Sequence, residues 1–99
     1  MAKEPIGGAL AIEVEMRREK VSALRRVGGK LESLLADLRA LEADPPRTDG
    51  DRARFVERHK QLRAEAEKYR WYLIIQREAV GLSNHDDVFT QFPIPAAIR

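Results

Sequence analysis

The side chains of this chain that could do chemistry are few and scattered along its 99 residues. The closest grouping is His85, Asp86 and Asp87, but adjacent residues at a helix start do not converge on one metal ion, and acids are favoured in a first helical turn anyway. His59 has no second titratable group converging on it. None of the three serines forms a nucleophile constellation, and the chain has no cysteine. The sequence therefore predicts a protein that is not an enzyme and has no catalytic residue, cofactor, metal site or small-molecule substrate.

The composition is that of one small globular domain, with 43% hydrophobic and 34% charged residues. Eighteen lysines and arginines against sixteen acids give a net charge of +2, which by itself does not argue for nucleic acid. The lack of cysteine fits a reducing compartment. The longest unbroken apolar run is the five residues 71–75, too short for a signal peptide or a membrane span. We expect a cytoplasmic chain that does not bind membrane.

Two long segments carry residues at the alternating four- and three-residue spacing of a heptad repeat, which is typical of packed helices. In segment 9–43 this heptad seam comprises Leu10, Val14, Arg17, Val21, Leu24, Gly28, Leu31, Leu35 and Leu38. In segment 51–80 it comprises Phe55, His59, Leu62, Ala66, Tyr69, Leu73, Gln76 and Val80. The stretch DPPRTDG at 44–50 separates them, since proline cannot continue a helix. The pattern predicts an all-α fold in which two helices form an antiparallel, coiled-coil-like hairpin.

A loop centred near residues 48 and 49 predicts which seam residues face one another, to within about one helical turn. Gly28 should then face Tyr69, and this small-against-large packing would explain a helix-interior glycine. His59 should face Leu38, with its ring edge in water. The alternative is that Gly28 and Gly29 break the first segment and produce three helices.

We expect three parts: an N-terminal arm at 1–8, the hairpin at 9–82, and a short helix with an extended tail at 83–99. Gly81 is a natural C-terminal cap for the second long helix. Ser83 or Asn84 can cap the short helix, and the prolines at 93 and 95 then enforce an extended chain.

Trp71, Ile74 and Ile75 fall outside the seam of the second long helix, and we name them the apolar platform. The hairpin alone cannot bury them, and leaving them in water favours association. One cover is the chain's own short helix and tail, with Phe92 and Ile94, folding back over Trp71 and Ile75. A second is another copy of the chain, because an apolar row beside the seam is wide enough for a homodimeric four-helix bundle. That row consists of Val27, Leu34 and Leu41. A third is a different protein.

Charged positions flank the seam on one side, and four of them are arginines: Arg18, Arg25, Arg70 and Arg77. We name these the arginine edge. Arg63 should pair with Glu32, whereas the four have no such partner across the hairpin and would attract an anionic surface. The alternative is that glutamates neutralise them locally on a solvated face. The glutamates in question are Glu13, Glu19, Glu67 and Glu78.

These patterns together predict a small, non-catalytic, bacterial-style adaptor or regulator that binds a protein partner or itself. The predicted interaction residues are Arg18, Arg25, Arg70, Trp71, Ile74, Ile75, Arg77, Phe92 and Ile94. The alternative is a helical protein that binds nucleic acid, with the arginine edge on phosphates and Trp71 or Tyr72 stacked on bases.

Overall fold

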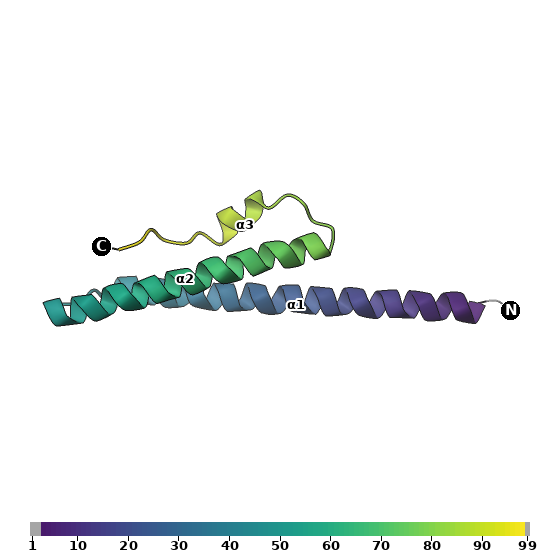
Figure 1. Ribbon diagram of the computed structural model, residues 1–99, viewed down its shortest axis with the longest axis horizontal. Coiled ribbons are helices and arrows are strands. Elements are labelled where there is room, and N and C mark those ends of the chain that lie inside the picture. Colours follow the sequence, from purple (N-terminus) through teal and green to yellow (C-terminus); the bar gives the residue numbers. More distant parts are fainter. Residues whose placement is uncertain (1–2, 99) are drawn as a thin grey trace.

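A computed structural model of the chain describes residues 3–98, and the side chains of residues 10–98. It is a long, narrow molecule of 76 × 21 × 16 Å, built from α1 (Lys3–Ala43), α2 (Asp49–Ala79) and the short α3 (Asp86–Gln91) (Figure 1). α1 and α2 pack against each other in opposite directions, and no strand occurs within residues 3–98. The predicted all-α hairpin is therefore confirmed. Residues 1–2 of the predicted arm and Arg99 of the predicted tail lie outside the described residues.

α1 is longer than the sequence pattern indicated. It begins at Lys3 rather than near residue 9, and it continues through Gly28 and Gly29 to Ala43 without a break. The alternative of two separate helices in this segment was therefore wrong. Each of the two glycines weakens a helix by about 1 kcal/mol relative to alanine, and packing against α2 on both sides of them offsets this cost.

The connection between the long helices is shorter than predicted, because α2 begins at Asp49 rather than near residue 51. The Thr48 hydroxyl accepts a hydrogen bond of 3.1 Å from the backbone N–H of Asp51. This is the N-cap half of a capping box, and it satisfies one of the N–H groups that a first helical turn leaves unpaired.

The end of α2 follows the prediction. Gly81 is the one residue of the described chain with a positive φ, 92°, and its N–H donates to Glu78 O at 3.0 Å. A left-handed residue after the last turn reverses the chain, which is a position that favours glycine. The chain then enters α3, where Asn84 Oδ1 accepts a hydrogen bond from the Asp86 N–H at 3.0 Å.

The two long helices are paired one helical turn away from the expected register, at the limit of the expected precision. A Cβ on Gly28 would lie 4.0 Å from Leu73 Cδ1, four residues beyond the expected Tyr69. His59 Nε2 lies 2.7 Å from Glu42 Oε1, again four residues beyond the expected Leu38. The predicted environment of His59 was also wrong. Its side chain is buried, with 1% of its surface exposed, and its ring edge does not face water.

The core lies in the half of the hairpin nearest the loop. It combines leucines of α1 with residues of α2, and Val88 and Phe92 of the C-terminal segment join the same cluster. Leu34 is buried in this core, and Val27 and Leu41 pack against it. The row that was expected to remain free for a four-helix bundle is therefore used inside the chain itself.

Candidate protein-interaction surfaces

The C-terminal segment runs back along the hairpin and is held by three arginines of α2 that are spaced seven residues apart (Figure 1). Arg77, nearest the end of α2, donates to Asn84 O at 3.2 Å and to Asp87 Oδ1 at 2.9 Å. Arg63, two heptads earlier, donates through Nε to Pro95 O at 2.6 Å. These contacts fix both ends of the segment against α2.

Arg70 holds the middle of the segment in two ways. It donates to Phe92 O at 3.3 Å, and its guanidinium lies 4.7 Å from the centre of the Phe89 ring. A cation over an aromatic face is attracted by the ring quadrupole, so the contact with Phe89 adds to the hydrogen bond. Phe89 itself is 51% exposed, and Arg70 lies against one side of it.

These contacts correct the prediction that the residues of the arginine edge lack partners within the chain. Arg70 and Arg77 were expected to lack a partner within the hairpin, but they bind carbonyl oxygens of the chain's own C-terminal segment. Arg63 was expected to pair with Glu32, and it pairs instead with Glu67 at 3.2 Å. An extended segment with few side-chain acceptors still offers backbone carbonyls, and the several N–H groups of arginine suit them.

The apolar platform is divided between the inside and the outside of the molecule. Ile74 is buried in one cluster with Phe92, while Trp71 and Ile75 are 60% and 43% exposed. Ile94 is half-buried against the same cluster, so the tail does fold back, but the expectation that it covers Trp71 and Ile75 was wrong. The platform residue in this cluster is Ile74. The exposed part of the platform is thus Trp71 and Ile75.

A larger open surface lies on α1. Because Gly28 is level with Leu73, the last residue of α2 reaches only to about residue 22 of α1. The N-terminal part of α1 projects past it by roughly 28 Å at about 1.5 Å per residue (Figure 1). We name residues 10–21 the α1 extension, and every one of them is exposed. Its large apolar residues are Leu10, Ile12, Val14, Met16 and Val21.

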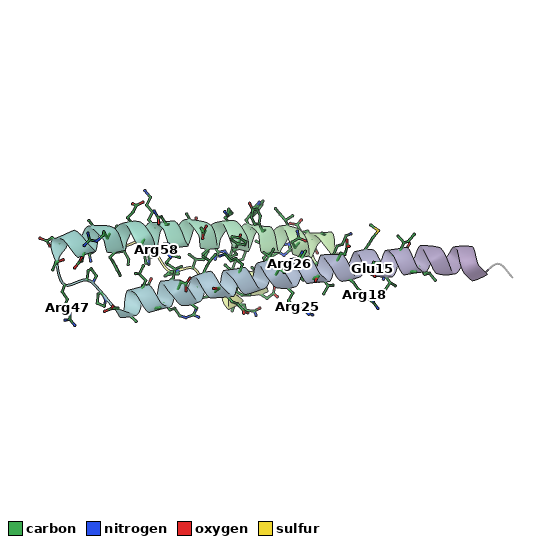
Figure 2. All side chains as sticks on the ribbon, turned by 90° about the horizontal axis from the view of Figure 1, so that it is seen from below. Glu15, Arg18, Arg25, Arg26, Arg47 and Arg58 are labelled. Carbon is green, nitrogen blue, oxygen red and sulfur yellow. The ribbon has the colours of Figure 1, made fainter. Side chains whose placement is uncertain are left out.

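One face of the α1 extension forms an open groove that continues to Arg25. Its lining consists of Val14, Arg17, Arg18, Val21, Ser22 and Arg25. Arg18 and Arg25 project from the same side of α1 (Figure 2). No described acidic residue forms an ion pair with any of the three groove arginines. The groove is therefore apolar along its floor and positively charged along one margin.

The charge of this region is uneven in a way that the net charge of +2 conceals. Residues 17–30 contain six basic residues and one acidic residue, Glu19. Arg18 and Arg25 of the predicted arginine edge lie here and remain exposed. The alternative, local neutralisation by Glu13 and Glu19, is not seen as an ion pair among the described side chains.

Within residues 3–98 no cluster of three or more histidine, cysteine or acidic side chains is placed to hold a metal ion. His85 Nε2 lies 3.7 Å from Glu78 Oε1, and Asp87 pairs with Arg77. No described helix has the length and apolar character needed to cross a membrane. Comparison of the chain with protein-family models, curated proteins and solved structures gives no match.

The sequence pattern missed the α1 extension, because Leu10, Val14 and Val21 were assigned to the interior of the hairpin. A signal for the extension was nevertheless present. In the observed register and in the expected one, the positions opposite Leu10 and Val14 fall after the chain-reversing Gly81. A seam that continues where its partner helix has ended must face water or another molecule.

Proposed function

We propose that this chain is a small, non-catalytic protein-interaction module, an adaptor or regulatory subunit of the cytoplasm. The observation that supports this most directly is the α1 extension. Its residues Leu10, Val14 and Val21 belong to the heptad seam that α2 covers further along the same helix, yet they are 55%, 45% and 45% exposed. A second helix fits this seam by the same rule that seats α2.

The energetics favour a covered extension. Burying a leucine or valine side chain contributes about 1.5–3 kcal/mol relative to leaving it in water. A helix of this length without tertiary packing is marginal in water, so a partner would also stabilise the helical form of the extension. Trp71 and Ile75 on α2 offer a second, smaller apolar surface, with the aromatic character common in interface anchors.

The partner in this proposal is a protein, either a different chain or a second copy of this one. Arg70 and Arg77 do not contribute directly, because the tail occupies them. Phe92 and Ile94 act within the chain, where they pack in and against the core. Of the predicted interaction residues, the proposal retains as contact residues Arg18, Arg25, Trp71 and Ile75, and it adds Val14 and Val21.

Site-specific photo-crosslinking tests this function. A photo-crosslinking amino acid is placed at Val14, at Trp71, or at the exposed polar position Glu57 as the matched control, and each variant is irradiated in the cells that make the chain. We expect a discrete cross-linked protein product from Val14 that Glu57 does not give. If neither Val14 nor Trp71 gives a product above the Glu57 control, the proposed function is wrong.

Nucleic-acid binding is the second candidate, supported by the six basic residues within positions 17–30 and by the exposed Trp71. An electrophoretic mobility assay at low and moderate salt separates the two functions. A nucleic-acid-binding module must retard a labelled oligonucleotide in the gel, and this binding must weaken steeply as the salt concentration rises. No shift at low salt removes this candidate.

A further inference from the structure

We propose that the groove on the α1 extension binds an amphipathic, acidic α-helix of a partner protein. The inference rests on the proposed function and deepens it, since it names the chemistry of the segment that covers the seam.

The apolar floor of the groove points to a helix as the occupant. Val14 and Val21 lie seven residues apart in the same seam that α2 covers between Leu24 and Leu38. Side chains spaced by four and three residues match another helix, because a helix repeats its own apolar stripe with the same spacing. A helix lying on Val14 and Val21 would extend the two-helix packing of the hairpin past the end of α2.

The margin of the groove points to acidic side chains on that helix. Arg18 and Arg25 occupy equivalent flanking positions seven residues apart, and Arg17 lies between Val14 and Val21 in the seam. Glutamates at the flanking heptad positions of a partner would meet both Arg18 and Arg25, which sets orientation and raises the association rate.

Two other occupants fit this groove less well. A second copy whose α1 packs in parallel on the first would bring the same basic stretch, residues 17–30 with six basic residues and one acidic residue, against the groove arginines. A nucleic-acid backbone would satisfy the arginines but leave Val14 and Val21 uncovered, because phosphates and sugars do not replace an apolar side chain in the seam.

The test uses the full chain and a defined probe. The probe is a fluorescein-labelled peptide of about three heptads with leucine at both core positions and glutamate at both flanking positions; the matched control peptide carries lysine in place of each glutamate. Like-charged flanks oppose the pairing of each peptide with itself at neutral pH. The third arm is a labelled DNA single strand of about 20 nucleotides, longer than the usual site of about 4–16 nucleotides.

Fluorescence anisotropy should show binding of the glutamate peptide, weakened by added salt, and no comparable binding of the lysine peptide. Val14→Glu together with Val21→Glu should weaken binding by at least about tenfold, the loss expected for removing interface anchors. Ile12→Glu, on the other face of the same extension, is the control and should retain binding.

The charge margin is tested in the same assay. Arg18→Glu together with Arg25→Glu should reverse the preference toward the lysine peptide, because specificity follows the sign of the flanking charges. None of the substituted side chains of the extension, nor Arg25, packs in the core of the hairpin, so the variants should fold.

Four outcomes would count against the proposal. Equal binding of both peptides would overturn it, because such binding would reflect apolar contact without charge selection. Binding of the oligonucleotide alone would assign the groove to nucleic acid. A dimer in light scattering that the Val14 and Val21 variant abolishes would assign it to a second copy. Failure of the glutamate peptide to bind, combined with a cross-linked product from Val14 or Trp71, refutes this inference and leaves the proposed function standing. Failure of the peptide together with no product from either position refutes both.

Discussion

Replacing Gly28 with alanine should stabilise this protein. The sequence pattern explained Gly28 as the small residue that makes room for a large side chain across the hairpin. The structure removes that reason, since a Cβ at Gly28 would lie 4.0 Å from Leu73 Cδ1, an ordinary van der Waals contact. The backbone there is right-handed helix within an unbroken α1, so alanine fits without strain.

The expected gain comes from helix propensity. Glycine in a helix interior is less favourable than alanine by about 0.8–1.0 kcal/mol, largely because the unfolded glycine chain has more freedom to lose. For a domain of this size, about 1 kcal/mol raises the melting temperature by roughly 4–8 °C. The new methyl group also contacts Leu73, so the gain in free energy of unfolding should lie at the upper end of this range.

Thermal and urea unfolding followed by circular dichroism measure the effect. Gly29→Ala is the matched control, because nothing lies within 4 Å of a Cβ at that position and only propensity acts there. Both variants should gain stability, with Gly28→Ala at least equal to Gly29→Ala. A lower melting temperature for Gly28→Ala, with a gain for Gly29→Ala, would show that the helices approach too closely at Gly28 for a methyl group and would refute the reasoning.

Three further predictions concern the start of α2 and the C-terminal segment. Thr48→Ala removes the N-cap of α2 and should cost about 1 kcal/mol in urea unfolding, whereas a cost near zero would mean that the cap is not formed in solution. The hydrogen bond from Thr48, and then that from Arg54, lowers the pKa of Asp51 below its usual value, so this carboxylate stabilises the fold above the usual pKa and loses its contribution as the pH falls through the lowered one. An NMR titration should show that Thr48→Ala raises the midpoint of Asp51, and an unchanged midpoint would contradict this. Removing residues 83–99 deletes the buried Val88 and Phe92 from the cluster that holds Ile74, which should lower stability by about 3 kcal/mol or more and increase binding of a hydrophobic dye. Trp71→Ala, at an exposed position, is the control for the truncation and should change stability by less than about 1 kcal/mol; equal effects of the two would mean that the tail does not pack on the hairpin.

The hairpin itself could be predicted from the sequence because its signals are local and strong. Heptad spacing defines both long helices, and the two prolines at 45 and 46 mark the place of the reversal. Gly81 was predicted as a cap because the residue after a helix often adopts a positive φ, which glycine adopts without steric strain.

The register was one turn off because the connection was treated as a symmetric loop between helix ends at the same level. In the observed register, Ala43 at the end of α1 is level with about residue 58, so α2 begins about nine residues, or roughly 13 Å, beyond the end of α1 (Figure 1). The chain covers this distance in residues 44–48, where two consecutive prolines favour an extended backbone. The four-residue shift then determines which side chains meet, including the burial of His59 beside Glu42.

The partners of the arginines could not be predicted from side-chain patterns. Arg63, Arg70 and Arg77 form one stripe on α2, and such a stripe looks the same in the sequence whether it faces water, another protein or the chain's own backbone. Their acceptors are mostly carbonyl oxygens of the C-terminal segment, which every residue carries and no residue type reveals. The sequence also did not show where the C-terminal segment would lie, and Val88 and Phe92 of that segment share the buried cluster of Ile74 while Ile75 stays exposed.

Amide hydrogen exchange of the purified chain at low concentration tests the central claim most directly, namely that α1 continues past its own partner helix and leaves a seam open for another protein. Residues 10–21 are all exposed, whereas Leu31 and Leu38 lie in the core. We expect the amides of residues 10–21 to exchange far faster than those of residues 31–38 and to become protected when a partner helix is bound. Protection of residues 10–21 equal to that of the core, in a chain that light scattering shows to be a monomer, would mean that the seam is already covered and would contradict the account.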